Sequence, residues 1–114
     1  MSSQSLSNYL RRHRKPTGLS QEELAILLGF ESGGQVARQE MGHRKPSLQT
    51  ALAYEAIYGK SVRELFLGDA QQVETIIRNN VRKLQGEIAR RKPGKRREAK
   101  LAFLKDLLNR LSQS

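Results

Sequence analysis

The sequence predicts an all-α protein that consists of five short helices over residues 5–68 and a basic helical hairpin over residues 69–114. Three observations support this fold class. Apolar residues recur three or four positions apart along most of the chain, as they do on one face of a helix. A serine followed three residues later by a glutamate, the capping box that opens a helix, occurs at Ser20 and at Ser61. Glycines follow several apolar stretches, where they can end a helix.

The first two predicted helices are bounded by proline, serine and glycine. The first covers residues 5–14 and is stopped by Pro16 and Gly18. The second begins after Ser20 and ends at Gly29. The apolar positions are Leu6, Tyr9, Leu10 and His13 in the first helix, and Leu24, Leu27 and Leu28 in the second.

The third predicted helix covers residues 33–41. Ser32 and Gln35 have the spacing of a capping box at its start. The helical period places Val36 toward the core and Arg38 toward solvent.

Two further helices complete the predicted bundle. Pro46 and Ser47 open the fourth helix, and Gly59 ends it. Ser61 and Glu64 form the capping box of a short fifth helix. The apolar positions expected in the core are Leu48, Leu52, Ile57 and Tyr58 in the fourth helix, and Val62, Leu65 and Phe66 in the fifth.

The predicted hairpin is longer and more highly charged. Its first helix runs from about residue 70 to residue 91, and residues 92–95 break the pattern before a final helix. Two interpretations remain open, because the hairpin can join two copies of the chain or can fold back and complete the core of a monomer. The apolar positions are Val73, Ile76, Ile77, Val81, Leu84 and Ile88, then Leu101, Leu104, Leu107, Leu108 and Leu111.

The charge balance points to a polyanionic partner. The 114 residues include 21 Lys and Arg against 11 Asp and Glu, a net charge of +10. Residues 1–68 contain nine basic and six acidic side chains, and residues 69–114 contain twelve and five, so the hairpin carries most of the excess. A basic protein without such a partner is the alternative.

Several function classes find no support in the sequence. There is no cysteine, and the two histidines, His13 and His43, lie in unrelated segments, so we expect no metal site, no cofactor and no enzymatic activity. No apolar stretch is long enough to span a membrane, and the first residues do not resemble a signal peptide. We therefore expect a cytoplasmic protein.

Residues 5–68 resemble the lambda-repressor-like, or Xre-type, helix-turn-helix DNA-binding family. The resemblance rests on Leu10, Arg14, the run 18–25, Glu40, Gly42, the run 46–48, Gly59 and Leu65 with Phe66. It implies double-stranded DNA as partner, a bacterial or phage origin and a transcription regulator as function. The simplest such regulator is a repressor that occupies an operator with a recognition helix near residues 33–41. An antitoxin that binds a toxin and represses its own operon, and an architectural or RNA-binding protein, are the alternatives.

The resemblance also implies roles for individual residues. Base contacts fall on Ser32, Gln35 and Arg38, although Gln35 cannot both read a base and complete a capping box. Arg14 is expected to form a partly buried ion pair with Glu40. Phosphate contacts fall on Gln21, Gly33, Gly34, Arg44 and Lys45.

The sequence departs from the family pattern in the turn, in the core and in the residues that are expected to contact bases. The stretch between Gly29 and Glu40 is one residue longer than usual, and Gln39 and Glu55 occupy positions that are usually apolar or small. The two glycines at the start of the third helix offer no side chain for base reading, so we expect modest sequence specificity for each half-site. We expect a homodimer, which would strengthen this specificity by binding two half-sites. The turn of the hairpin supplies a further set of basic residues, either a second phosphate-contacting arm or a solvated turn: Arg90, Arg91, Lys92, Lys95, Arg96 and Arg97.

Overall fold

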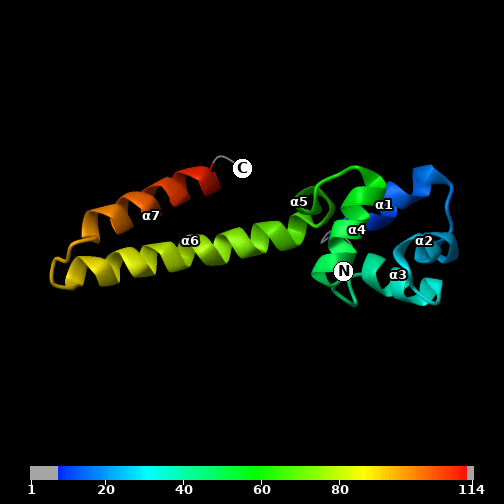
Figure 1. The fold of residues 1–114 in the computed structure, drawn as a ribbon, viewed down its shortest axis with the longest axis horizontal. Coiled ribbons are helices and arrows are strands. Elements are labelled where there is room, and N and C mark those ends of the chain that lie inside the picture. The colour runs from blue at the N-terminus through cyan, green and yellow to red at the C-terminus, as the bar shows by residue number, and fades with distance from the viewer. Residues whose placement is uncertain (1–7, 113–114) are drawn as a thin grey trace. The chain divides into compact units, whose positions relative to one another are not determined.

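The computed structural model describes residues 8–112, which are helical over most of their length (Figure 1). The chain divides into two compact units, Met1–Ala70 and Gln71–Ser114. The first unit contains α1 (Leu10–Arg14), the short 3-10 helix η2 (Lys15–Thr17), α2 (Gln21–Leu28), α3 (Gly33–Glu40), α4 (Leu48–Tyr58) and α5 (Val62–Leu65). The second contains most of α6 (Leu67–Arg90) and all of α7 (Arg97–Ser112).

Both predicted glutamate capping boxes are present. Ser20 Oγ accepts a hydrogen bond from the backbone N–H of Glu23 at 3.0 Å, and the carboxylate of Glu23 accepts one from the backbone N–H of Ser20 at 2.9 Å. Ser61 and Glu64 repeat this arrangement at the start of α5. The hydrogen bond from Ser61 lowers the pKa of Glu64. These boxes fix where α2 and α5 begin.

The core of the first unit forms around five side chains that are almost completely buried. Leu10, Leu24, Val36, Tyr54 and Leu65 come from five different helices. Ala25, Ala51 and Phe66 complete the cluster. Because each helix contributes to one apolar cluster, the position of α2 and α3 depends on all five.

Three leucines predicted in this core are exposed. Leu27 on α2 is 58% exposed, and Leu48 and Leu52 on α4 are 70% and 50% exposed. The residues of α4 that are buried are Ala51 and Tyr54. Apolar residues occur on every side of α4, so spacing alone did not identify the buried face.

α1 begins at Leu10, so Asn8 and Tyr9, which were predicted to be helical, lie before it, and the predicted residues 5–7, with Leu6, lie outside the described residues. Asn8 explains the late start, because its Oδ1 accepts a hydrogen bond from the backbone N–H of Leu10 at 3.1 Å. Its Nδ2 donates to the backbone carbonyl of Gln39 at 3.0 Å. Asn8 therefore sets the start of α1 and ties it to α3.

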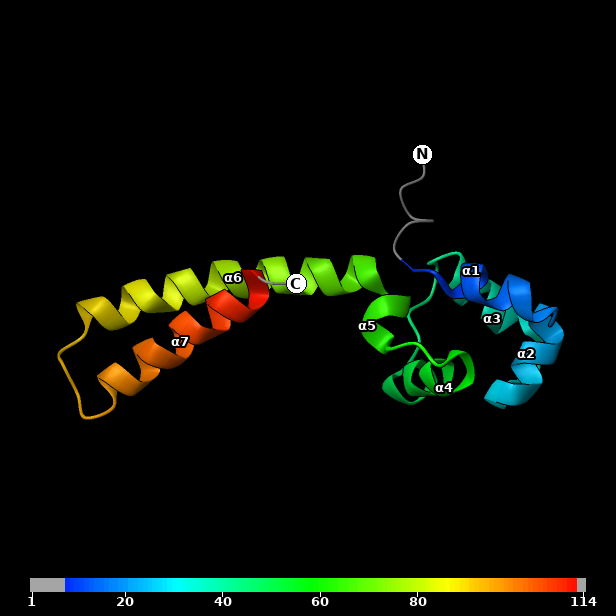
Figure 2. The same ribbon diagram turned by 90° about the horizontal axis from the view of Figure 1, so that it is seen from above.

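The second unit is the predicted hairpin, in which α6 and α7 lie side by side (Figures 1 and 2). Its buried residues are Val81, Ile88 and Leu104, with Ile77, Leu101, Leu107 and Leu108 packed against them. Part of the predicted apolar face is instead open, because Val73, Ile76 and Leu84 are 53%, 57% and 38% exposed. Phe103, which was not among the predicted apolar positions, is 58% exposed. Among the described helices, none has the length and apolarity needed to cross a membrane.

Candidate nucleic-acid interface

The two helices of the predicted DNA-binding motif meet at a glycine. A Cβ atom added to Gly33 would lie 2.9 Å from the backbone nitrogen of Glu22 and 3.0 Å from the backbone carbon of Gln21. Gly33 is buried, so it belongs to the contact between α2 and α3 rather than to an exposed surface. This first glycine of the pair allows the start of α3 to approach the start of α2 closely.

The second glycine is in a different environment. A Cβ atom added to Gly34 would have as its nearest neighbours Arg38 Nη1 and Ser32 Oγ, both at the ordinary contact distance of 3.5 Å. Ser32 caps α3 by accepting a hydrogen bond from the backbone N–H of Gly34 at 3.3 Å. A side chain at Gly34 would therefore meet only side-chain atoms at ordinary contact distance.

The predicted capping box of α3 is absent, because Ser32 bonds to Gly34 and the side chain of Gln35 takes no part in the cap. Gln35 instead lines a hollow of about 290 Å³ between α3 and the start of α4. Capping therefore does not compete with base reading at this residue. The other residues of the hollow are Phe30, Gln39, Arg44, Lys45, Ser47 and Thr50.

The exposed side of α3 continues into a basic loop. Ser32 and Arg38 are exposed, and so are Arg44 and Lys45. The backbone N–H of Arg44 donates to the carbonyl of Arg38 at 3.3 Å, which holds the loop against the end of α3. Lys45 Nζ lies 2.7 Å from a carboxylate oxygen of Asp69, in a pair whose lysine side chain is 64% exposed. Such an exposed pair leaves the cation accessible to a phosphate.

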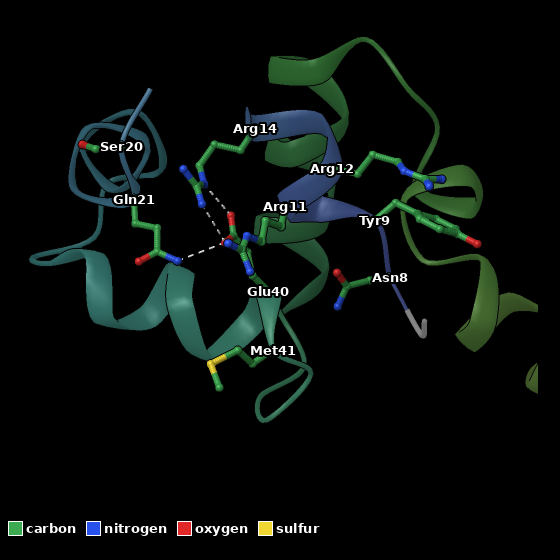
Figure 3. A pocket seen from close by; sticks show the side chains of 9 residues that line it. All are labelled: Asn8, Tyr9, Arg11, Arg12, Arg14, Ser20, Gln21, Glu40 and Met41. Atoms are coloured by element: carbon green, nitrogen blue, oxygen red, sulfur yellow. Dashed lines mark hydrogen bonds and ion pairs between the residues drawn. The ribbon is translucent and has the colours of Figure 1, made fainter. Parts of the chain in front are cut away.

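Arg14 and Glu40 form the expected ion pair, and it is bidentate (Figure 3). Arg14 Nε lies 2.7 Å from Glu40 Oε2, and Nη2 lies 3.2 Å from Oε1. Their side chains are 11% and 1% exposed. The hydrogen bond that Arg14 donates to Glu40 raises the pKa of Arg14, against the opposing effect of burial.

Gln21 joins this ion pair. Its Nε2 donates to Glu40 Oε1 at 3.0 Å, and Figure 3 shows Arg14 and Gln21 converging on the same carboxylate. The side-chain nitrogen of Gln21 is thus engaged inside the protein. A phosphate at the start of α2 is left with the backbone N–H groups of the first turn.

The two polar departures from the family pattern have partners. Gln39 is 5% exposed, and its Oε1 accepts a hydrogen bond from the hydroxyl of Tyr54 at 2.7 Å. Glu55 accepts a hydrogen bond from the backbone N–H of Val62 at 3.0 Å and so satisfies the start of α5. The role of Asn8 was not predicted from the sequence, because this residue fell inside the predicted first helix and no local pattern marked it.

Tyr58 lies near the ion pair with its hydroxyl unsatisfied. Within residues 8–112 this buried oxygen has no hydrogen-bond partner. Burial and the charge of Glu40 raise the pKa of Tyr58 to about 12, and Arg14 opposes this rise. Burial also raises the pKa of Tyr54.

These pKa shifts predict a loss of stability at alkaline pH. A tyrosine in the unfolded chain deprotonates near pH 10, so above about pH 10 the unfolded state binds fewer protons than the folded state. The free energy of unfolding should therefore fall from about pH 10 to about pH 12. Tyr58→Phe should make this fall shallower and cost nothing at pH 7, whereas Tyr54→Phe should cost about 1–3 kcal/mol at pH 7 because Gln39 loses its donor. Denaturant titrations at several pH values measure both effects, and equal losses at pH 7 would contradict this view.

The basic residues of the hairpin turn lie in the second unit. All six that were predicted as an accessory arm are described by the structure, and five of them are exposed while Arg97 is half-buried. Elsewhere, the described part of the chain contains no group of three or more His, Cys, Asp or Glu side chains that could hold a metal ion.

A comparison with family models matches residues 10–65 to a family described as helix-turn-helix. Searches of curated proteins and of solved structures gave no match. The matched segment begins with α1 and ends with α5, so it coincides with the helices that build the core around α2 and α3.

Proposed function

We propose that this chain, which belongs over residues 10–65 to the lambda-repressor-like and Xre-like helix-turn-helix family, is a repressor that blocks transcription by occupying an operator. The chain is a DNA-binding transcription regulator by virtue of this family. The observation that supports a repressor at an operator is the packing of α3. Because Gly33 has no side chain, α3 packs closely against α2, and Ser32 and Arg38 remain exposed on one side of the motif.

In this proposal α3 enters the major groove of DNA. Arg38 reads guanine through two donors, and Gln35 is free to reach adenine because it does not cap the helix. Arg44 and Lys45 contact phosphates beyond the end of α3. Gln21 contacts a phosphate through its backbone N–H, since its side-chain nitrogen is held by Glu40.

Arg38→Ala is expected to relax the preference at one base position, at a cost of about 1–3 kcal/mol in discrimination. Selection of bound sequences from random duplex DNA, repeated at two salt concentrations, measures the preference. Arg44→Ala is the matched control, because losing a phosphate contact weakens binding to all sequences alike and lowers the salt slope by about 0.9. If Arg38→Ala selects the same sequence as the wild type, base reading by Arg38 is excluded.

The repressor is proposed to act as a homodimer joined through its hairpins. Exposed apolar residues on the otherwise highly charged hairpin support this assignment. They are Val73, Ile76, Leu84 and Phe103. Two recognition helices about one DNA turn apart would then read a palindrome and strengthen a weak half-site. Sedimentation equilibrium at micromolar concentration should give a dimer, and a monomer would contradict the proposal.

An antitoxin is the second candidate function, and a specific hollow of the hairpin favours it. Leu84, Ile88, Phe103 and Leu104 line about 310 Å³ of largely apolar space, with Arg91 and Lys100 beside them. An apolar side chain from an acidic partner protein suits this hollow. A small toxin gene next to this reading frame, and a stable complex between the two products, would favour the antitoxin over a repressor without a protein partner.

A further inference from the structure

The turn of the hairpin contains a hollow of about 240 Å³ that is surrounded by positive charge. Six of its eight lining residues are Lys or Arg, and none of the eight is acidic. We call this hollow the turn pocket. Its lining residues are Ile88, Arg91, Lys92, Gly94, Lys95, Arg96, Arg97 and Lys100.

Two of the six cations are used inside the protein. Arg97 Nη1 donates to the backbone carbonyls of Ile88 at 3.3 Å and Arg91 at 3.2 Å, so it satisfies the end of α6. Arg91 also lies 3.6 Å from the carboxylate of Glu87 one helical turn earlier. Arg97 and Arg91 therefore shape the turn, and they are unsuitable as probes of ligand binding.

The other four cations have no such partners. Lys92, Lys95, Arg96 and Lys100 are exposed, and within residues 8–112 their side chains form no hydrogen bond or ion pair. Four unpaired positive charges around one hollow repel one another, and a multiply coordinating anion removes this repulsion. Arg97 lies at the start of α7, where the helix dipole adds positive potential.

We propose that the turn pocket is a second DNA-binding site that takes one stretch of phosphodiester backbone without reading sequence. This inference rests on the proposed DNA-binding function for its choice of polyanion, because a bound operator brings DNA to a high effective concentration near the hairpin. A duplex presents phosphates continuously, so several cations of the pocket can be neutralised at once. One chain then holds DNA at two places, one in each unit.

The test compares two triple variants of the full chain that remove the same charge. The turn variant replaces three unpaired cations of the pocket: Lys92→Gln, Lys95→Gln and Arg96→Gln. The control variant replaces three exposed cations of the same hairpin outside the pocket: Arg82→Gln, Lys83→Gln and Lys105→Gln. Circular dichroism melts should coincide with the wild type for both, because all six side chains are exposed.

Binding of random duplex DNA over a salt series is the measurement. The turn variant should lower the salt slope by up to about 2.7, which corresponds to about 0.9 for each of three phosphate contacts. The control variant should lower it by much less. Equal decreases would show a general effect of net charge, and an unchanged slope in the turn variant would show a solvated turn. Either result overturns the proposal.

Two further experiments distinguish DNA-backbone binding at the turn pocket from base reading by α3 and from binding to a membrane. In the sequence selection, the turn variant should choose the same sequence as the wild type, so failure of base reading by Arg38 does not affect the result for the pocket. Vesicles that contain phosphatidylserine test a membrane instead of DNA. If the turn variant loses vesicle binding while its DNA slope is unchanged, the pocket serves a lipid surface and the proposal is wrong.

Discussion

Glu40→Gln is expected to destabilise the helical bundle by about 3–5 kcal/mol. The substitution removes the negative charge opposite Arg14, whose side chain is only 11% exposed. It also weakens the hydrogen bond from Gln21. The cost therefore comes from an uncompensated buried cation rather than from the loss of one favourable contact.

The exposed pair between Lys45 and Asp69 provides the control. Asp69→Asn removes a partner at the same distance of 2.7 Å but in contact with solvent, so it should cost at most about 1 kcal/mol. Denaturant unfolding followed by circular dichroism measures both variants. Combining Arg14→Gln with Glu40→Gln should cost clearly less than the sum of the two single substitutions, since the partners act as one unit. Additive losses, or equal losses for Glu40→Gln and Asp69→Asn, would mean that the pair is not coupled.

Gly33→Ala is expected to destabilise the protein by about 1–3 kcal/mol and to weaken DNA binding. The added methyl group would sit 2.9 Å from the backbone nitrogen of Glu22 and 3.0 Å from the backbone carbon of Gln21. These backbone atoms of α2 cannot move aside as the end of a flexible side chain can. The start of α3 must therefore shift away from α2. Because α3 presents Arg38, this shift should also lower the affinity for a selected operator.

Gly34→Ala is the matched substitution one residue later. Its methyl group would meet only ordinary contacts at 3.5 Å, and alanine favours a helix over glycine by up to about 1 kcal/mol. We expect Gly34→Ala to melt at or above the wild-type temperature while Gly33→Ala melts below it. Thermal unfolding and operator titrations measure the difference, and similar behaviour of the two variants would refute the close contact.

The pair Gly33 and Gly34 shows how far the sequence alone leads. In the sequence the two residues are equivalent, because neither supplies a side chain that could contact a base at the start of the recognition helix. The structure separates them, because Gly33 is buried against the backbone of α2, whereas a Cβ atom at Gly34 would make only ordinary contacts with the side chains of Arg38 and Ser32. No local pattern distinguishes these environments, since they depend on where another helix passes.

The core of α4 and the engagement of Gln21 are further examples. Leu48 and Leu52 have the spacing of a buried face, yet they are exposed and Ala51 and Tyr54 are the buried residues of α4. Of the four predicted positions in this helix, Ile57 and Tyr58 pack against the core. Gln21 stands at a family phosphate position, yet its side chain binds Glu40, which is 19 residues away. Each outcome depends on competition among several possible contacts at a distance along the chain.

The sequence by itself determined the start of α2 and α5 and the ends of α2 and α4. Ser20 with Glu23, and Ser61 with Glu64, satisfy backbone groups within one turn, and Gly29 and Gly59 adopt the left-handed conformation at positive φ of 82° and 68°. These signals act over three or four residues and need no other helix. The tertiary structure alone decided which helix faces are buried, why Gly33 must be small and what Gln21 binds. Burial and close approach are properties of pairs of helices, and their partners lie far apart in the sequence.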